Sequence, residues 1–259
     1  MWFDTHVNLH HERFDGDRDA VVARARDAGV GDMIEICQNA NERARILELA
    51  ERFDIWATVG THPHHADAAG ELTAESLVET AAHPRVVGIG ETGLDFHYGY
   101  SSEAAQRANF ARHIRASQDT QLPLVIHSRE ADVQMIEMLD AAYADSAFPM
   151  VLHCFTATPE LARAVLDRGG YISFSGIVTF KSADAVRAAV ALVPDNRLLV
   201  ETDCPYLTPV PDRGQRCEPH HVARVGETVA ALRDWTPERC AEMTTANAYR
   251  LFSKARRDG

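Results

Sequence analysis

Histidines and acidic residues close several short apolar runs in this chain, and together they could bind a metal ion. The donor set consists of two imidazoles and two carboxylates, from His127, His153, Glu91 and Asp203. Such a set suits Zn²⁺, Mn²⁺ or, with more water ligands, Mg²⁺. A divalent ion polarises a carbonyl or phosphoryl group and lowers the pKa of water, so the set predicts hydrolysis. Each residue alone is more often a core histidine or a helix cap, but four at equivalent places favour a site.

Eight runs rich in valine, isoleucine and aromatic residues predict β-strands. They cover residues 2–9, 32–37, 56–60, 86–91, 123–128, 149–155, 171–176 and 198–203. Helical periodicity follows nearly every run, most clearly at residues 19–28, 41–52, 103–120, 131–143 and 159–168. One unit takes about 32 residues, which predicts an α/β fold, a (β/α)₈ TIM barrel. The barrel is predicted to be a single domain over residues 1–259, closed by helices within 219–252. A doubly wound open sheet would have fewer strands and a glycine-rich loop after the first.

The polar residues at the ends of the runs should meet on one face, because the carboxyl ends of barrel strands converge there. They are His6, Asn8, His62, Glu91, His127, His153 and Asp203. Side chains alternate along a strand, so His6 and Asn8 share a face, and Glu201 and Asp203 both point inward. Two inward carboxylates are costly unless cations compensate, and two ions bridged by Glu91 would do so.

The remaining histidines near these runs are less informative. His10 and His11 follow the first run and are predicted to lie on the surface. Loop positions leave solvent exposure and substrate contact equally open for His64, His65, His97, His220 and His221.

Charge, cysteine spacing and hydropathy restrict the partners and the location that can be expected for this protein. The chain has 26 basic and 38 acidic residues and a net charge of -12, so nucleic-acid binding would have to be local or metal-mediated. Its five cysteines are scattered without a C-x-x-C pair, which predicts reduced thiols in a cytoplasmic protein. The N-terminus lacks the pattern of a signal peptide, and no apolar run is long enough to cross a membrane.

Six motifs carry a resemblance over the whole chain. They are Val7-Asn8-Leu9, Thr61-His62-Pro63-His64, Gly90-Glu91-Thr92-Gly93-Leu94-Asp95, His127-Ser128-Arg129, His153-Cys154-Phe155 and Glu201-Thr202-Asp203-Cys204-Pro205-Tyr206-Leu207. With them the chain resembles the TatD-type metal-dependent deoxyribonucleases of the amidohydrolase-like barrels. The resemblance implies metal ligation by Glu91, His127, His153 and Asp203. It also implies a substrate site lined by His62, His64 and Arg129, and single-stranded DNA trimmed from its 3′ end.

Two positions depart from many relatives of that family. The first strand ends His6-Val7-Asn8 where they have a His-x-His pair, and Cys217 replaces the asparagine of an Arg-Asn-Glu-Pro segment. An amide oxygen suits a hard ion better than zinc, so we expect Mg²⁺, with Mn²⁺ or Zn²⁺ as alternatives, at one or two ions per chain. The Val-Asn-Leu sequence is also typical of the TatD branch in the strict sense.

The function predicted on these grounds is metal-dependent hydrolysis of DNA phosphodiester bonds, as a 3′-5′ exonuclease on single strands. Asp203 is the expected general base, and Glu91 orients the metal. The alternative is an ester or amide hydrolase, such as an aminoacyl-tRNA deacylase, because fold alone does not choose between these bonds. A non-catalytic metal-binding barrel ranks last. We expect a monomer that binds nucleic acid and no membrane.

Overall fold

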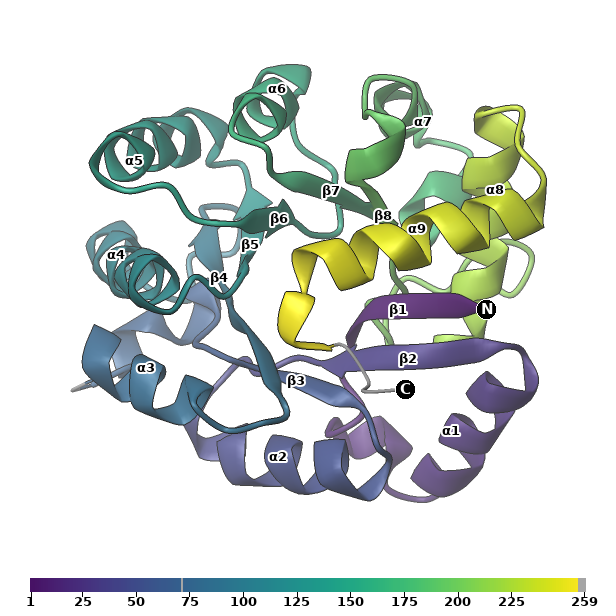
Figure 1. Ribbon diagram of the computed structural model, residues 1–259, viewed down its shortest axis with the longest axis horizontal. Helices are drawn as coiled ribbons and strands as arrows, with labels where there is room; N and C mark the ends of the chain where they lie inside the picture. The colour runs from purple at the N-terminus through teal and green to yellow at the C-terminus, as the bar shows by residue number, and fades with distance from the viewer. Residues whose placement is uncertain (71, 256–259) are drawn as a thin grey trace.

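The chain forms a parallel barrel enclosed by helices (Figure 1). The computed structural model describes residues 1–70 and 72–255. Within them, eight strands follow chain order, and each is parallel to its neighbours. They are β1 (Trp2–Val7), β2 (Val30–Glu35), β3 (Trp56–Val59), β4 (Val86–Asp95), β5 (Leu124–Arg129), β6 (Met150–Leu152), β7 (Tyr171–Phe174) and β8 (Leu198–Val200). The TIM barrel predicted from the sequence is confirmed.

Contacts between β1 and the segment after β8 bring the two ends of the sheet together. The amide of Asp203 donates to the His6 carbonyl at 3.0 Å, and the amide of Asn8 donates to the Cys204 carbonyl at 3.1 Å. Val7 and Cys204 also form an isolated parallel bridge. This pairing excludes a doubly wound open sheet and places the polar ends of the first and last strands side by side.

Helices cover the outside of the barrel (Figure 1). The α-helices are α1 (Arg18–Asp27), α2 (Arg43–Arg52), α3 (Ala74–Ala81), α4 (Glu103–Thr120), α5 (Asp132–Asp145), α6 (Pro159–Asp167), α7 (Asp184–Val190), α8 (Val222–Leu232) and α9 (Pro237–Leu251). Short 3₁₀ turns are η1 (Glu12–Phe14), η2 (Ala40–Glu42), η3 (Pro63–Ala68), η4 (Gly176–Thr179), η5 (Asp195–Arg197), η6 (Pro219–His221) and η7 (Ser253–Ala255). Across residues 1–70 and 72–255, none of the helices combines the length and apolarity needed to span a bilayer.

The interior of the barrel is filled by one apolar side chain from each strand. Around the barrel these are Phe3, Ile34, Trp56, Val87, Val125, Val151, Tyr171 and Leu199. Leu251 and Phe252, at the end of α9, belong to the same cluster, and Asn247 of α9 donates to the Leu198 carbonyl at 2.9 Å. The end of α9 thus covers the amino end of the barrel, which leaves the carboxyl end for polar groups.

All eight strands differ by a few residues from the predicted runs, and the differences in β4, β6 and β8 bear on the site. β4 does not end at Glu91 but continues to Asp95, because residues 92–95 pair with residues 126–129 of β5. β6 and β8 end earlier than predicted, so His153 and Asp203 lie in the segments just beyond them. Asp203 has a left-handed φ of 57°, which turns the chain at this point. Because β4 extends to Asp95, it contributes two carboxylates, Glu91 and Asp95, to the carboxyl end of the barrel.

Candidate metal centre

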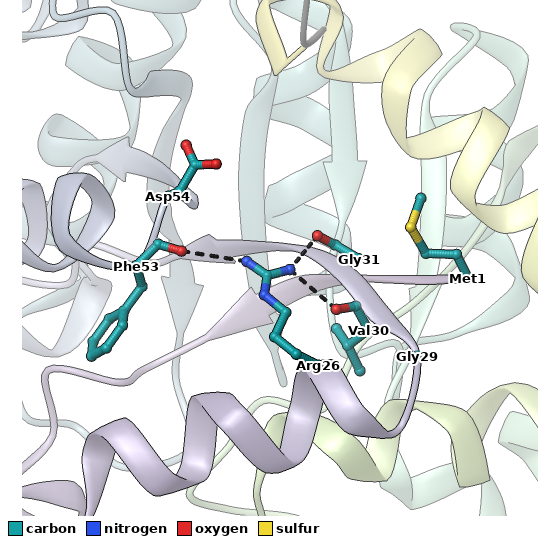
Figure 2. Close-up of a pocket in the computed structure, with 7 residues that line it drawn as sticks. All are labelled: Met1, Arg26, Gly29, Val30, Gly31, Phe53 and Asp54. Carbon is teal, nitrogen blue, oxygen red and sulfur yellow. Dashed lines mark hydrogen bonds between the residues drawn. The ribbon is translucent and has the colours of Figure 1, made fainter. Parts of the chain in front are cut away.

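Two cavities lie at opposite ends of the barrel. The larger, about 1320 Å³, is at the carboxyl ends of the strands, and its lining includes His62, Glu91, His127, His153 and Asp203. The smaller, about 690 Å³, lies at the amino end, where Figure 2 shows Arg26 between the start of β2 and Phe53, in the segment before β3. Arg26 there donates hydrogen bonds to the carbonyls of Val30, Gly31 and Phe53. The Arg26 guanidinium is therefore used to bind backbone carbonyls around the start of β2. The cluster of ionisable side chains lies in the larger cavity.

Glu91 lies at the centre of the cluster and is 1% exposed. Imidazole and amide nitrogens surround its carboxylate, at 2.7 Å (His153 Nε2), 3.2 Å (His127 Nδ1), 3.4 Å (His62 Nε2), 3.4 Å (His6 Nε2) and 3.1 Å (Gln38 Nε2). Burial alone would raise the pKa of this carboxyl, but the surrounding histidines hold the pKa well below its ordinary value. Glu91 is therefore an anion with cationic or nitrogen neighbours at both oxygens.

A second group of donors lies beside Glu91. The rings of His6 and His153 stack with centroids 4.1 Å apart, and His153 Nδ1 donates to Glu201 at 3.2 Å. Burial lowers the pKa of His153, but the charges of Glu91 and Glu201 raise it well above its ordinary value. Candidate ligand atoms lie within 4.8 Å of one another in two triads, His6–His153–Glu201 and His62–Glu91–His127.

The bonding of these donors fits a metal ion better than a self-contained hydrogen-bond network. His6 Nε2, His153 Nε2 and Glu201 Oε2 are buried without a hydrogen-bond partner among the described residues. His153 Nε2 lies 2.7 Å from Glu91, yet without the alignment of a hydrogen bond. Buried polar atoms are normally satisfied, so convergent unsatisfied nitrogens and oxygens are the donor arrangement that a divalent cation requires.

Asp203 approaches the cluster from the turn after β8. Its Oδ1 lies 3.5 Å from His6 Nε2 and accepts a hydrogen bond from Asn8 Nδ2 at 3.3 Å. His6 and Asn8 thus both reach Asp203 from the end of β1. Burial raises the pKa of the Asp203 carboxyl to about 6, although His6 and His153 act in the opposite direction. A carboxyl that titrates near neutrality is suited to accept and release a proton.

Asp95, at the end of β4, holds two histidines and a loop in place. Its Oδ2 accepts from His64 Nε2 at 2.8 Å and from His127 Nε2 at 3.1 Å. Its Oδ1 accepts from the backbone amides of His97 and Tyr98 at 3.0 and 3.2 Å. Burial raises the pKa of Asp95, but the bonds from His127 and His64 hold the pKa below its ordinary value. By accepting from Nε2, Asp95 orients Nδ1 of His127 towards Glu91.

The backbones of β3, β4 and β5 approach one another closely beside this cluster. A Cβ at Gly60 would lie 2.4 Å from the Gly90 carbonyl carbon, and one at Gly93 would lie 2.0 Å from the His127 carbonyl oxygen. Any side chain at either position would push these strands apart. Glycine at these positions therefore permits the short distances from Glu91 to His62 and His127.

Helix α4 fixes the segment just before His62. Asn109 Nδ2 donates to the Thr61 carbonyl at 2.8 Å, and His113 Nε2 accepts from the Thr61 amide at 2.9 Å. His113 Nδ1 donates to the Asn109 carbonyl at 2.8 Å, so the ring is neutral. Burial lowers the pKa of His113 to about 4, in agreement with that role. Burial likewise lowers the pKa of His62 to about 4, which leaves a lone pair on that ring.

The lining of the larger cavity includes the seven residues that the sequence predicted as metal ligands or substrate contacts: Glu91, His127, His153, Asp203, His62, His64 and Arg129. The surface placement predicted for His10 is wrong, because its side chain is only 9% exposed and its Nδ1 donates to Glu35 at 2.7 Å. Sequence reasoning missed Asp95 and Gln38. The spacing Glu91, Gly93, Asp95 would have placed Asp95 on the face of Glu91 had the fourth strand been extended.

A parallel (β/α)₈ barrel with histidine and carboxylate donors at its carboxyl end defines the class of TIM-barrel metal-dependent hydrolases. Within this class, the chain belongs to the TatD family, since the model of TatD related DNases matches residues 3–253.

Curated relatives and solved structures agree with this membership. An uncharacterised metal-dependent hydrolase of Bacillus subtilis, YabD, is 39% identical, over 97% of this chain and 99% of that protein. The 3′-5′ ssDNA/RNA exonuclease TatD of Salmonella typhimurium is 37% identical, over 96% of this chain and 98% of that protein. The crystal structure of YJJV, a TatD homologue from Escherichia coli, has a TM-score of 0.88 at 28% identity, covering 97% and 98% of the two chains.

Proposed function

We propose that this chain is a divalent-metal-dependent nuclease that hydrolyses phosphodiester bonds of single-stranded DNA from the 3′ end. The observation that carries the proposal is the enclosed Glu91, which belongs to one triad of metal donors and lies beside a second, in a cavity at the carboxyl ends of the strands. Family membership and a 37% identical relative named as a 3′-5′ ssDNA/RNA exonuclease support the choice of nucleic acid over other esters.

The ligands we propose are Glu91, His127, His153 and Asp203. His6, His62 and Glu201 complete the two triads around them. Glu91 has imidazole nitrogens near both oxygens, so either oxygen would be available to hold an ion. Mg²⁺ is the proposed native ion, with Mn²⁺ and Zn²⁺ as alternatives. When bound, such an ion supplies Lewis acidity at the phosphoryl oxygen and lowers the pKa of water.

The protein groups divide the remaining work. Asp203, which lines the cavity beside His153 and accepts a hydrogen bond from Asn8 at 3.3 Å, takes a proton from the attacking water. Arg129 and the histidines at positions 62 and 64 bind phosphate oxygens, since all three line the same cavity. Asp95 keeps His127 in one orientation and tautomer through its bond to Nε2.

Net charge supports a local mode of nucleic-acid binding. At -12, the protein as a whole repels polyanions, so affinity must come from the metal centre and the few cations beside it. We further propose that residues 1–259 act as one catalytic domain and as a monomer. The five free cysteines support a reducing, cytoplasmic location.

The test is an assay of metal-stripped protein with Mg²⁺, Mn²⁺ or Zn²⁺ restored singly. Labelled single-stranded DNA, double-stranded DNA, RNA and aminoacyl-tRNA are the substrates. We expect ion-dependent shortening of single-stranded DNA from its 3′ end. Turnover confined to the aminoacyl ester would instead make the protein a deacylase and overturn the proposal.

A matched pair of histidine variants tests the ligand assignment. His153→Ala should lower metal affinity by about 10- to 100-fold or more, because it removes a donor shared by both carboxylates. His11→Ala is the control, since its ring lies at the surface and contacts the Tyr206 hydroxyl at 3.1 Å. Equal metal affinity in the two variants would contradict the assignment.

A further inference from the structure

Two tyrosines after β4 form an exposed stacked pair at the edge of the cavity. The rings of Tyr98 and Tyr100 are parallel within 6°, with centroids 5.3 Å apart. Tyr98 is 47% exposed and Tyr100 is 65% exposed, and both line the cavity that contains Glu91. Large aromatic rings gain stability from burial, so two that stack in solvent offer an apolar, planar surface to a ligand.

Tyr98 is held by groups that belong to the candidate site, and Tyr100 stacks on Tyr98. The amide of Tyr98 donates to Asp95 Oδ1 at 3.2 Å, and Arg129 Nη1 donates to the Tyr98 hydroxyl at 3.1 Å. The guanidinium of Arg129 also lies over the Tyr98 ring, 4.7 Å from its centroid. A positive charge therefore lies next to the two aromatic faces.

A row of aromatic rings connects the tyrosines with the metal donors. His64 makes edge contacts with Tyr98 at 5.4 Å and with Tyr100 at 4.9 Å. His64 in turn contacts His62 at 4.3 Å, and His62 contacts His127 at 4.6 Å. His64 contacts both the tyrosine pair and His62, so a ligand stacked on the pair would be a close neighbour of a phosphate at the centre.

Tyr206 shows what distinguishes this pair from other exposed aromatic residues. It also lines the cavity and is also 47% exposed, but its contact with His11 is perpendicular, with ring centroids 5.7 Å apart. The hydroxyl of Tyr206 also lies 3.1 Å from His11 Nε2. Parallel stacking beside an arginine is confined, among the exposed aromatic residues that the structure describes, to Tyr98 and Tyr100.

We propose that Tyr98 and Tyr100 are a stacking platform for an unpaired nucleobase of the nucleic-acid substrate. Every base has a π-face, so the platform binds single strands without reading their sequence. Arg129 binds the phosphate next to the stacked base. A base held in a duplex cannot unstack to reach the rings, so the platform selects single-stranded ends. This inference rests on the proposed nuclease function, and it adds the structural basis for strand selection.

The experiment compares Tyr100→Leu with Tyr100→Phe, because Leu keeps apolar area without a ring and Phe keeps the ring. Leu192→Ala, which truncates a residue 46% exposed in the turn after α7, is the control. Each protein is assayed on a single-stranded oligonucleotide, on the same oligonucleotide with abasic terminal residues, and on bis(p-nitrophenyl) phosphate. Equilibrium binding of a phosphorothioate oligonucleotide, with and without the terminal bases, is measured alongside.

Tyr100→Leu should raise the KM of the base-bearing oligonucleotide by roughly 10-fold, since stacking one base on an aromatic ring contributes about this much affinity. Its kcat, its KM on the abasic oligonucleotide and its turnover of the nitrophenyl ester should match those of the unchanged protein. Tyr100→Phe and Leu192→Ala should match it on every substrate.

Two results would overturn the platform. One is an unchanged KM for the base-bearing oligonucleotide in Tyr100→Leu. If that variant also changes its oligomeric state, the rings serve self-association instead. The other is an equal rise in KM for base-bearing and abasic strands, which would show a backbone or folding effect. Failure of the proposed function is separate: the unchanged protein would then cleave no phosphodiester with any ion. In that case the binding ratio between base-bearing and abasic phosphorothioates still decides the inference.

Discussion

Replacing Asp95 with asparagine tests whether this carboxylate sets the tautomer of His127. One oxygen of Asp95 accepts two backbone amides, so the asparagine oxygen must take that place. The amide nitrogen then faces His127 Nε2, 3.1 Å away, where the carboxylate accepted a proton. To pair with an N–H donor, His127 must move its proton to Nδ1, the nitrogen that lies 3.2 Å from Glu91. That nitrogen then has no lone pair for a metal ion.

The expected loss follows from the number of ligands affected. One imidazole of the proposed set is disabled while the other donors stay in place, and removing such an orienting partner typically costs 10- to 100-fold in metal affinity. This corresponds to about 1.4 to 2.7 kcal/mol. Mg²⁺ depends little on nitrogen ligands, so the loss should be larger for Zn²⁺ than for Mg²⁺.

The assay is competition for each ion between the protein and a chromophoric chelator. Asp67→Asn is the matched control, because Asp67 accepts hydrogen bonds from Ser102 at 2.9 Å instead of from a histidine. His127→Ala in the Asp95→Asn background completes a double-mutant cycle. Because Asp95 acts through His127, Asp95→Asn should cause no further loss of metal affinity in a protein that already carries His127→Ala. Full additivity of the two losses, in proteins that keep their secondary structure, would refute the reasoning.

Three further outcomes are expected. Asp203→Asn should keep most metal binding but lose about 100-fold or more in kcat if Asp203 is the base, and a near-normal rate would assign the proton to another group. Asn8→His, at a position that donates to Asp203 at 3.3 Å, should raise the zinc retained after dialysis and shift the activating ion away from Mg²⁺; unchanged metal content and ion preference would contradict this. Burial lowers the pKa of His113 to about 4 from 6.5, so the folded state disfavours the proton and stability falls as pH drops through this window. Protonation sets an N–H against the Thr61 amide, so between pH 7 and pH 4 the free energy of unfolding should fall by about 3 kcal/mol more in the unchanged protein than in His113→Gln. An equal fall in the free energy of unfolding of the two proteins over this pH range, measured by urea denaturation, would refute it.

Local pattern was enough to predict the barrel. Apolar runs at regular spacing, each followed by helical periodicity, fit one topology well, and the order of the strands then follows from chain order. Strand ends were harder to predict. The glycines at positions 90 and 93 look like the end of a strand in sequence, yet β4 continues to Asp95 through its pairing with β5. Pairing is a tertiary contact, so no local pattern could reveal it.

The same division holds for the candidate site. The sequence by itself determined which residues could ligate, because the convergence of strand ends makes histidines and acids at those positions neighbours. It could not determine which nitrogen of His127 faces Glu91, that Asp95 accepts from the other nitrogen, or that His10 turns away to Glu35. These features depend on side-chain directions within a few ångströms, set by the close approach of backbones at Gly60 and Gly93 and by the grip of α4 on Thr61. Distances on that scale arise only when the barrel has closed and its strands are packed in register.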